Sequence, residues 1–242
     1  NYKFIKGTIQ NKELVDFILT ENKIDTIIHF AAQSHIDNSF RNPIQYTKDN
    51  ILGTHILLES VREYGNIEKF IHVSTDEVYG ESVCQETDIK NEKSILNPTN
   101  PYAATKASAE MLVNSYVYSY GLPVIITRGN NVYGPRQYPE KLIPKFINLL
   151  LDDKKCTIHG EWETERSFLY VDDVVKAFEM ILSKGKIGEI YNIGTNYEYS
   201  VMEIARRLIK LIHNCDMNED RHFKKYIEFV EDRKYNDKRY NI

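Results

Sequence analysis

The sequence predicts an α/β fold built on a doubly wound parallel sheet. Continuous apolar runs at 25–32 and 123–128 are typical of strands buried on both faces of such a sheet. Segments with apolar residues at helical spacing, such as 11–21, separate these runs. Alternation of this kind indicates parallel strands joined by right-handed helical crossovers.

The expected elements follow this alternation along the chain. We expect strands at 2–6, 25–32, 69–74, 123–128, near Thr157, near Phe168 and at 189–193, and helices at 11–21, 43–64, 101–120, near 140–151, at 171–183 and near 201–212. From Asn214 onward the chain is polar and charged with few apolar residues, so the regular pattern ends there. A boundary between residues 1–129 and a smaller part, 130–242, is expected at the Asn-Asn-Val-Tyr-Gly-Pro turn.

Composition excludes several classes of protein. The 242 residues are 42% hydrophobic and 27% charged, which is typical of a globular chain and not of a disordered one. A net charge of −4 gives no electrostatic reason to expect nucleic acid or an anionic membrane as partner. No run approaches the roughly 18 apolar residues of a membrane span. Cys84, Cys156 and Cys215 are widely spaced, so we expect free thiols, no metal site and a cytoplasmic protein.

Three segments are polar directly after an apolar strand: 30–38, 74–80 and 129–136. In a doubly wound sheet, ligands bind beyond the carboxyl ends of the strands. One such transition can arise by chance, but three together favour a ligand site.

The segment 74–80 carries adjacent acids, Asp76 and Glu77, next to the hydroxyl groups of Ser74 and Thr75. One interpretation is a helix cap or an Asx turn, which Asp and Thr commonly make at strand ends. The other is an acid–base pair, because neighbouring carboxyl groups in different environments can hold different pKa values.

A Tyr-x-x-x-Lys pattern occurs at Tyr102 and Lys106, and also at residues 2–6 on an expected strand. Asn100 and Pro101 look like an N-cap followed by proline in the first helical turn, so Tyr102 and Lys106 share one helical face. The ammonium group and the helix dipole are both expected to favour the phenolate of Tyr102. A phenol so placed can remove a proton from a hydroxyl group, whereas the alternative for Lys106 is a solvated side chain.

These segments resemble a known family. The motifs 74–80, Tyr102-x-x-x-Lys106, 130–135 and 139–144 are similar to those of the nucleotide-sugar 4,6-dehydratases of the dTDP-glucose 4,6-dehydratase type, which are extended short-chain dehydrogenase/reductases. Further matches are 30–35, Arg166 before 168–170, 191–194 and 232–233. The resemblance implies a Rossmann-like NAD-binding domain at 1–129 and a nucleotide-sugar-binding subdomain at 130–242, with segments that return to the sheet.

The resemblance also implies a reaction and its residues. A redox-neutral lyase of this family dehydrates a nucleoside-diphosphate glucose, dTDP- or UDP-glucose, to the 4-keto-6-deoxy sugar used in deoxysugar (rhamnose) biosynthesis. Tyr102, helped by Thr75, would take the proton of the sugar 4-hydroxyl while C4 gives hydride to NAD. Glu77 would remove the C5 proton, and a protonated Asp76 would supply a proton to the leaving 6-hydroxyl. The hydride would then return to C6.

Position-by-position matching extends the site. Residues expected along the NAD cleft are Thr8, Ile9, Phe30, Ala31, Ala32, Ser34, Asp49, Ser74, Tyr102, Lys106 and Asn131. Residues expected at the sugar, diphosphate, ribose or base of the substrate are Gln33, Thr75, Asn130, Lys141, Leu142, Thr157, Ile158, His159, Arg166, Asn192, Arg233 and Asn236. Arginine suits phosphate because its planar fork meets two oxygens, although an ion pair with Glu163 or Glu165 is the alternative for Arg166.

The chain departs from the family pattern in three ways. The N-terminal strand, Gly-rich phosphate loop and helix are absent, so we expect a fragment of a longer polypeptide. Thr8 stands where an Asp is usual at the adenine, and Asp49 where a Thr usually faces the cofactor. A homodimer is expected from the resemblance, with helices 43–64 and 101–120 as candidates for its interface. The alternatives to a dehydratase are a 4-epimerase of the same superfamily, which needs neither Asp76 nor Glu77, and a non-catalytic binding fragment.

Overall fold

The computed structural model describes residues 2–82, 89–160, 164–215, 224–231, 239–240 and 242. The chain forms two compact units. Unit 1 comprises residues 1–80, 91–129 and 178–193, and unit 2 comprises residues 81–90, 130–177 and 194–242. Each unit has its own buried core, so each is described by itself.

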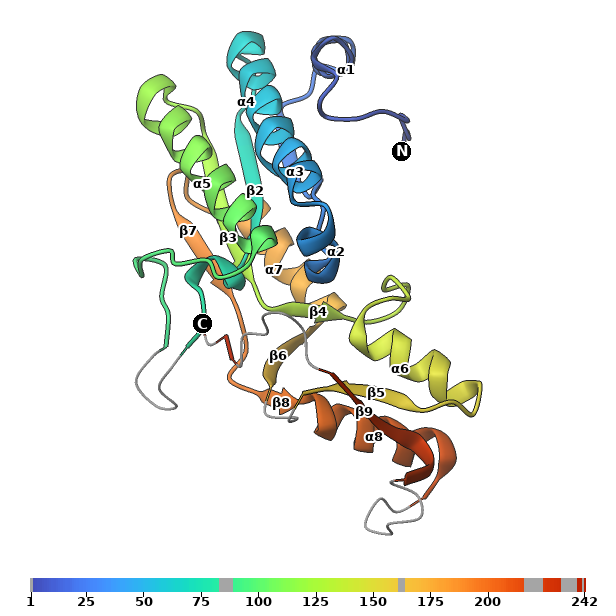
Figure 1. The fold of residues 1–242 in the computed structure, drawn as a ribbon. Helices are drawn as coiled ribbons and strands as arrows, with labels where there is room; N and C mark the ends of the chain where they lie inside the picture. Colours follow the sequence, from blue (N-terminus) through green and yellow to red (C-terminus); the bar gives the residue numbers. More distant parts are fainter. Residues whose placement is uncertain (1, 83–88, 161–163, 216–223, 232–238, 241) are drawn as a thin grey trace. The chain divides into compact units, whose positions relative to one another are not determined.

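Unit 1 is built on a four-stranded sheet in the order β1-β2-β3-β7 (Figure 1). The strands are β1 (Thr26–His29), β2 (Lys69–Thr75), β3 (Val124–Gly129) and β7 (Ile190–Ile193), and every neighbouring pair is parallel. The predicted parallel α/β fold is therefore confirmed. Its carboxyl edge carries the ends of β1 and β2, where two of the three predicted polar segments begin.

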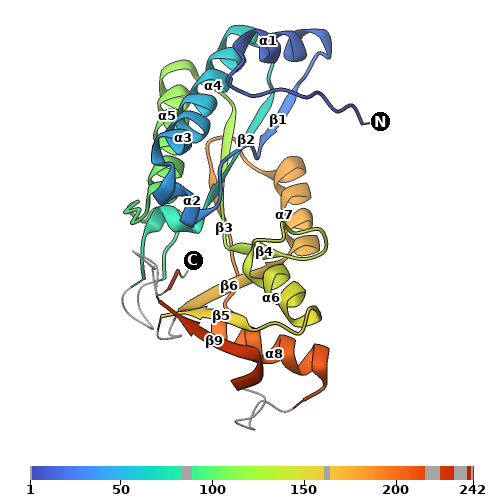
Figure 2. The ribbon, with the colours of Figure 1, turned by 45° about the vertical axis from the view of Figure 1, so that its right-hand side comes forward.

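Helices cover both faces of this sheet. One face packs on α1 (Lys12–Glu21), α4 (Gly53–Tyr64) and α5 (Pro101–Tyr120), with Phe70 and Leu58 at the centre of the core. The other face packs Ile71 and Ile125 against Ile181 of α7 (Val171–Lys184), and Figure 2 shows α7 on the side of the strands opposite α4 and α5. Because side chains alternate along β2, adjacent residues 70 and 71 enter different cores.

The segment between β1 and β2 is continuously helical over 43–64. A short helix, α2 (Ile36–Arg41), comes first. The continuous part then consists of α3 (Pro43–Tyr46), a π-helical stretch η1 (Thr47–Leu52), and α4. A π-helical stretch inside a longer helix is uncommon and occurs often near functional sites.

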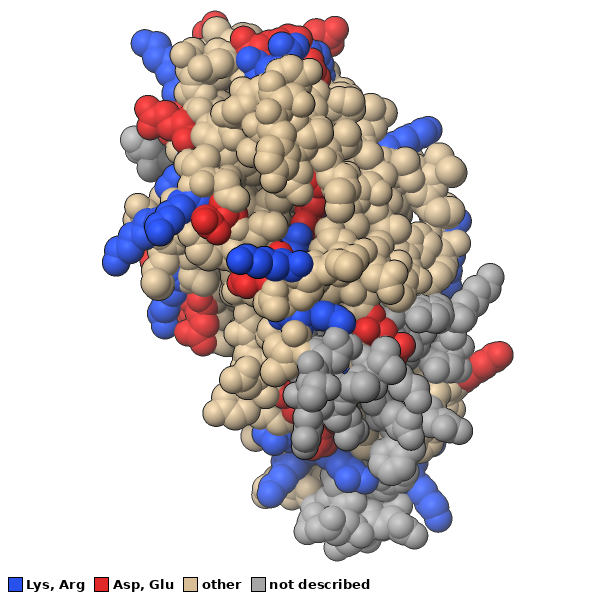
Figure 3. Space-filling view, turned by 90° about the vertical axis from the view of Figure 1, so that its left-hand side faces the viewer, with Lys and Arg blue, Asp and Glu red and all other residues tan. Residues whose placement is uncertain are grey.

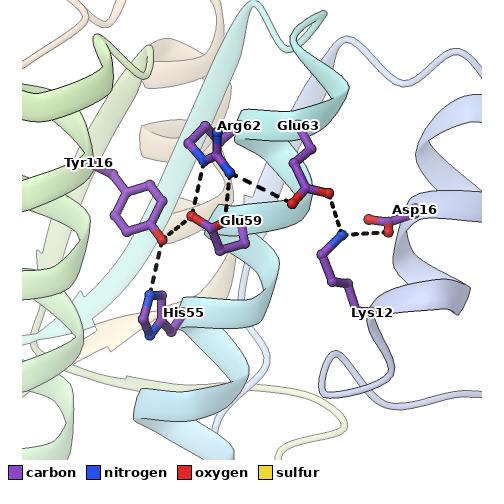
Figure 4. A network of polar contacts seen from close by, with 7 residues as sticks. All are labelled: Lys12, Asp16, His55, Glu59, Arg62, Glu63 and Tyr116. Carbon is purple, nitrogen blue, oxygen red and sulfur yellow. Dashed lines mark hydrogen bonds and ion pairs between the residues drawn. The ribbon is translucent and has the colours of Figure 1, made fainter.

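Polar contacts join α1, α4 and α5 on the outside of this core (Figure 4). The Lys12 ammonium lies 2.7 Å from Asp16 and 2.6 Å from Glu63, which links α1 to α4. The Tyr116 hydroxyl of α5 donates to Glu59 of α4. These pairs are partly exposed, so each adds little to the free energy of folding.

Unit 2 contains two small sheets and a helical core. The strand β6 (Glu165–Tyr170) pairs parallel with β4 (Asn131–Tyr133) and antiparallel with β8 (Glu198–Ser200). The strands β5 (Cys156–His159) and β9 (Ile227–Val230) form a parallel pair. Their inner side chains pack with α6 (Leu142–Leu151) and α8 (Val201–His213) around Phe146 and Ile158.

Two expectations about the elements were wrong. Residues 2–6 form no strand, and Tyr2 and Phe4 are exposed; β-propensity alone does not make a strand without a paired neighbour. The stretch after Asn214 contains β9, with Tyr226 and Ile227 buried in the core of unit 2. Two adjacent apolar residues were enough to anchor it. Within the described residues, no helix has the length and apolar character that crossing a membrane requires.

Candidate active site

The two adjacent acids lie on a short 3₁₀ turn at the carboxyl end of β2. This turn is η2 (Asp76–Tyr79), and the Thr75 side chain caps it by accepting from the backbone N–H of Glu77 at 3.4 Å. The Thr75 hydroxyl also donates to Asp76 Oδ1 at 3.1 Å. Thr75, Asp76 and Glu77 are all buried. The cap interpretation is therefore correct for Thr75, and the cap itself turns both carboxyl groups away from bulk water.

Asn100 connects this turn to helix α5. Its Oδ1 accepts from the backbone N–H of Ala103, which caps the helix, and its Nδ2 donates to Glu77 Oε2 at 3.0 Å. One amide thereby begins the helix and holds the carboxyl group of Glu77 near its first turn. The sequence identified Asn100 only as a cap, because spacing along the chain does not reveal a contact across 23 residues.

Tyr102 lies in the first turn of α5, 8% exposed, beside the acids. Burial, and then the carboxyl group of Glu77, raise the pKa of Tyr102 well above its ordinary value. A hydrogen bond with Thr75 opposes this rise, and Asp76 adds to it. The expected stabilisation of the phenolate is therefore wrong for the chain by itself, since desolvation and two carboxyl groups outweigh the helix dipole.

Lys106 lies one turn further along α5 and is 5% exposed. Its ammonium group donates to the backbone oxygen of Val73 at 2.7 Å, which ties the helix to β2. Burial lowers the pKa of Lys106 to about 8, and the carboxyl group of Glu110 acts in the opposite direction. The alternative of a solvated lysine is excluded.

A second polar segment leaves the end of β1. The Asn50 side chain accepts from the backbone N–H of Gln33 at 2.7 Å and donates to Thr105 of α5 at 2.9 Å, so it holds this segment near the helix. Phe30, Ala31, Ala32 and Ser34 are exposed on it. Asp49 accepts hydrogen bonds from the side-chain amides of Gln10, Gln33 and Gln45.

Three further residues expected along the cofactor cleft also lie in unit 1. The Ser74 hydroxyl is buried at the end of β2 and has no hydrogen-bond partner among the described residues. The Thr8 hydroxyl accepts from the backbone N–H of Gln10, and the Ile9 side chain lies against Gly53 of α4. A Cβ at residue 53 would stand 2.9 Å from Ile9 Cδ1, so the Ile9 side chain would have to shift to admit one.

The residues expected at the substrate are distributed over both units. Asn192 is in unit 1, where its Oδ1 accepts from the Tyr79 hydroxyl at 2.8 Å. The members in unit 2 are Asn130, Lys141, Leu142, Thr157, Ile158, His159 and Arg166, joined there by Asn131 of the cofactor set. Arg233 and Asn236 lie outside the described residues, as do Cys84 and Glu163.

Within unit 2 these side chains have distinct surroundings. The Asn130 side chain accepts from the backbone N–H of Thr195, and His159 contacts the backbone oxygen of Glu231. The Arg166 guanidinium lies 5.0 Å from the Tyr240 ring centroid and donates to the backbone oxygen of Glu165. The Ile158 side chain is fully buried in the core of unit 2, so any contact with a base must come from its backbone.

Sequence reasoning missed a buried charged pair behind the acids. Glu110 of α5 is 0% exposed, and its carboxyl group binds the guanidinium of Arg128, on β3, at 2.6 Å. Arg128 also donates to the hydroxyl of Tyr79, the last residue of η2, at 2.7 Å. One signal was available: Lys106 and Glu110 are the charged residues of α5, and a charge within a buried helix needs a partner.

The fold and this site define a class: a Rossmann-like α/β protein with a Tyr-x-x-x-Lys helix beside a Thr-Asp-Glu turn. A family model described as GDP-mannose 4,6 dehydratase matches residues 1–241. The chain belongs to this family, and the resemblance to the nucleotide-sugar 4,6-dehydratases is confirmed.

Two curated relatives show how close the similarity is. A dTDP-D-glucose 4,6-dehydratase of Dictyostelium discoideum is 49% identical over 277 residues, covering 100% of this chain and 63% of the relative. A trifunctional UDP-glucose 4,6-dehydratase/UDP-4-keto-6-deoxy-D-glucose 3,5-epimerase/UDP-4-keto-L-rhamnose-reductase of Arabidopsis thaliana is 54% identical over 240 residues, covering 99% of this chain and 35% of the relative. The chain thus spans under two thirds of each.

Solved structures of related enzymes share the fold of this chain. A dTDP-glucose 4,6-dehydratase from Streptomyces venezuelae, crystallised with NAD, has a TM-score of 0.90 and 36% identity, covering 99% of this chain and 70% of that one. A UDP-glucose 4-epimerase from Thermotoga maritima has a TM-score of 0.87 and 32% identity, covering 100% of this chain and 75% of that one. The fold is shared by both activities, so the side chains must distinguish them.

The burial of Lys106 predicts a rise in stability at alkaline pH. Its pKa is about 8 in the folded chain and 10.5 when exposed, so between these values the unfolded chain binds more protons and the free energy of unfolding increases with pH. From pH 8 to about pH 10 this contribution amounts to about 2 kcal/mol. Lys106→Met should lack that rise in urea unfolding, whereas Lys145→Met, which changes an exposed lysine, should keep it. An equal pH dependence in all three proteins would contradict the burial of the ammonium group.

Proposed function

We propose that this protein dehydrates a nucleoside-diphosphate glucose to the 4-keto-6-deoxy sugar nucleotide, with NAD as cofactor. The observation that carries the proposal is the convergence of Tyr102 with Asp76 and Glu77 in one buried place. Removing water from C5 and C6 needs one proton taken and one delivered, and oxidation of C4 needs a neighbouring base for the proton of the 4-hydroxyl, a role that Tyr102 can fill. The 4,6-dehydratases among the relatives support the same reaction.

The residues of unit 1 fit NAD. The buried, unpartnered Ser74 hydroxyl lies at the carboxyl end of β2, where a parallel sheet binds dinucleotides. Phe30, Ala31, Ala32 and Ser34 are accessible at the end of β1, and Tyr102 and Lys106 suit the hydroxyl groups of the nicotinamide ribose. When bound there, NAD would supply the hydride acceptor and donor, and its oxidised form would add a positive charge to the site.

The first step uses the phenol of Tyr102. Its hydrogen bond with Thr75 places the oxygen beside a second hydroxyl that can relay or share the proton of the sugar 4-hydroxyl. The phenolate form of Tyr102 takes this proton while C4 loses a hydride, which leaves a ketone at C4 and a neutral phenol at Tyr102. The positive charge of a bound cofactor would oppose the effect of the two carboxyl groups and would lower the pKa of Tyr102 toward the phenolate.

The second step uses the two carboxyl groups. A ketone at C4 acidifies the proton at C5, which Glu77 removes; Asn100 holds the carboxyl group in place for this. Asp76, which shares a hydrogen bond with Thr75, delivers a proton to the 6-hydroxyl, and water leaves. Hydride addition at C6 and a proton at C5 then complete the product, so the reaction consumes no external reductant.

A 4-epimerase is the second candidate, because an epimerase shares the fold. Epimerisation at C4 needs the phenol but no acid or base at C5 and C6. The structure buries two carboxyl groups beside Tyr102, and burying such groups without a chemical use is unfavourable. This burial favours dehydration.

The nucleotide and sugar-diphosphate contacts remain the ones expected from the sequence, with unit 1 as the NAD-binding part and unit 2 as the main substrate-binding part. Arg166, exposed in part and stacked on Tyr240, suits a diphosphate. Thymidine and uridine present the same hydrogen-bonding edge, so dTDP-glucose and UDP-glucose are both proposed. Free thiols at Cys156 and Cys215 support a cytoplasmic location.

The protein is further proposed to form a homodimer through α5. The charged residues of this 20-residue helix, Lys106 and Glu110, are both buried, so its outer face is uncharged. Met111 and Tyr118 are exposed on that face. Figure 3 shows the side of the molecule that carries α5, with a broad area free of charged side chains. Uncharged faces with exposed aromatic and Met residues are typical of interfaces.

The assigned roles predict different failures for two variants of the full-length protein incubated with dTDP-glucose or UDP-glucose. Glu77→Gln should still reduce NAD on mixing but should slow water loss about 10²- to 10⁴-fold, since the base at C5 is missing. Tyr102→Phe should suppress NAD reduction itself. Absorbance of reduced nicotinamide and mass spectrometry of the product separate the two steps, with Glu68→Gln as an exposed control. Equal, mild effects of both changes, or a product that keeps its 6-hydroxyl, would refute the roles.

The dimer proposal predicts that a charge on α5 separates the subunits. Met111→Glu should give a monomer in sedimentation or light scattering, because it buries a carboxylate in the interface. Met180→Glu changes an equally exposed methionine on α7 and should leave the dimer intact. A wild-type protein that is monomeric at micromolar concentration would rule the interface out.

A further inference from the structure

A buried chain of hydrogen bonds begins at Glu110, one helical turn beyond Lys106 on α5. The Glu110 carboxyl group is 0% exposed and accepts from Arg128 Nε at 3.2 Å and from Nη2 at 2.6 Å. Arg128, on β3, is itself 3% exposed. The guanidinium therefore meets both carboxylate oxygens with its fork, a geometry that lysine cannot reproduce.

The other end of the guanidinium reaches the turn that carries the acids. Arg128 Nη1 donates to the Tyr79 hydroxyl at 2.7 Å, and that hydroxyl donates to Asn192 Oδ1 at 2.8 Å. Tyr79 is the last residue of η2, two positions after Glu77. This bond orients the Asn192 amide with its Oδ1 toward Tyr79.

Stability does not explain this pair. A buried ion pair carries a desolvation penalty that its mutual attraction only partly offsets, and apolar side chains of similar volume are often as stable. The pair instead holds elements in fixed positions. Its hydrogen bonds, with those of Tyr79, join α5 to β3, β3 to η2, and η2 to β7. Asn100 holds the Glu77 side of η2 to α5, and Arg128 holds the Tyr79 side.

We infer that Arg128 is a positioning residue that, through Tyr79 and Glu110, sets the place of Asp76 and Glu77 relative to Tyr102. This inference rests on the proposed dehydration and assigns the network to its second step. Tyr102 and Lys106 sit on α5 itself, so loosening η2 moves the acid and base at C6 and C5 while the phenol stays in place.

The test removes one hydroxyl group. Tyr79→Phe keeps the ring, over which the Arg128 guanidinium lies 4.7 Å from the centroid, but removes the hydrogen bonds of the hydroxyl with Arg128 and Asn192. In the full-length protein with NAD and sugar nucleotide, we expect NAD reduction on mixing to keep its wild-type rate. Water loss and the exchange of the C5 hydrogen with deuterated solvent should slow about 10- to 100-fold, because small misplacements of a base have effects of this size. Tyr116→Phe is the matched control: it removes a buried hydroxyl where α5 packs on α4, bonded to Glu59 and His55, and should leave both steps unchanged.

A second variant separates positioning from folding. In the double variant, Glu110 and Arg128 are both replaced by Met, which removes both charges and keeps side chains of similar volume. The melting temperature of this variant should lie within about 5 °C of that of the wild type. It should nevertheless slow water loss and C5 exchange, as Tyr79→Phe does. Arg128→Lys should slow these steps as well, since the fork is lost while the charge is kept.

Several results would overturn the inference. These are Tyr79→Phe with unchanged water loss, Tyr79→Phe with NAD reduction and water loss slowed equally, a Tyr79→Phe protein that does not fold, or a folded double variant that reacts like the wild type. A wild-type protein that releases no water from either nucleotide sugar would instead refute the proposed function, so the two failures are distinguishable.

Discussion

The hydrogen bond from the Asn100 amide to Glu77 is the contact on which the rest of the site depends. The parallel sheet brings the end of β2 and the start of α5 to one edge, but it does not by itself fix the distance between them. Asn100 begins the helix with its oxygen and holds the acidic turn with its nitrogen. A phenol, an ammonium group and two carboxyl groups are thereby placed together without direct contact with bulk water.

Burial is the main influence on the protonation of Tyr102 and Lys106. Burial raises the pKa of Tyr102 and lowers that of Lys106 to about 8, so both groups lean toward their neutral forms in the chain by itself. Such a site responds strongly to any charge that enters it, because interactions are weakly screened there. The Tyr102 phenol would therefore shift toward the phenolate, the base that the first step needs, when a positively charged cofactor is bound.

Local signals predicted the fold well. Asn100 and Pro101 predicted the start of α5, since a cap acts within one turn, and apolar runs predicted the four strands of unit 1. Contacts between distant residues could not be predicted this way. Glu110 and Arg128 are 18 residues apart on a helix and a strand, and only their mutual burial shows that they pair. The prediction of a strand at residues 2–6 was wrong for a related reason. Their side chains suit a strand, but a strand also needs a neighbour to pair with, and β-propensity says nothing of that neighbour.

The fate of the hydrogen on C4 tests the account most directly. Glucose nucleotide labelled with deuterium at C4 should give a product that has lost its 6-hydroxyl and carries the deuterium at C6, because the hydride taken in the first step returns there. Mass spectrometry and NMR of the product read both features in one sample. Deuterium that remains at C4 beside an intact 6-hydroxyl would contradict the account and assign Asp76 and Glu77 some other role.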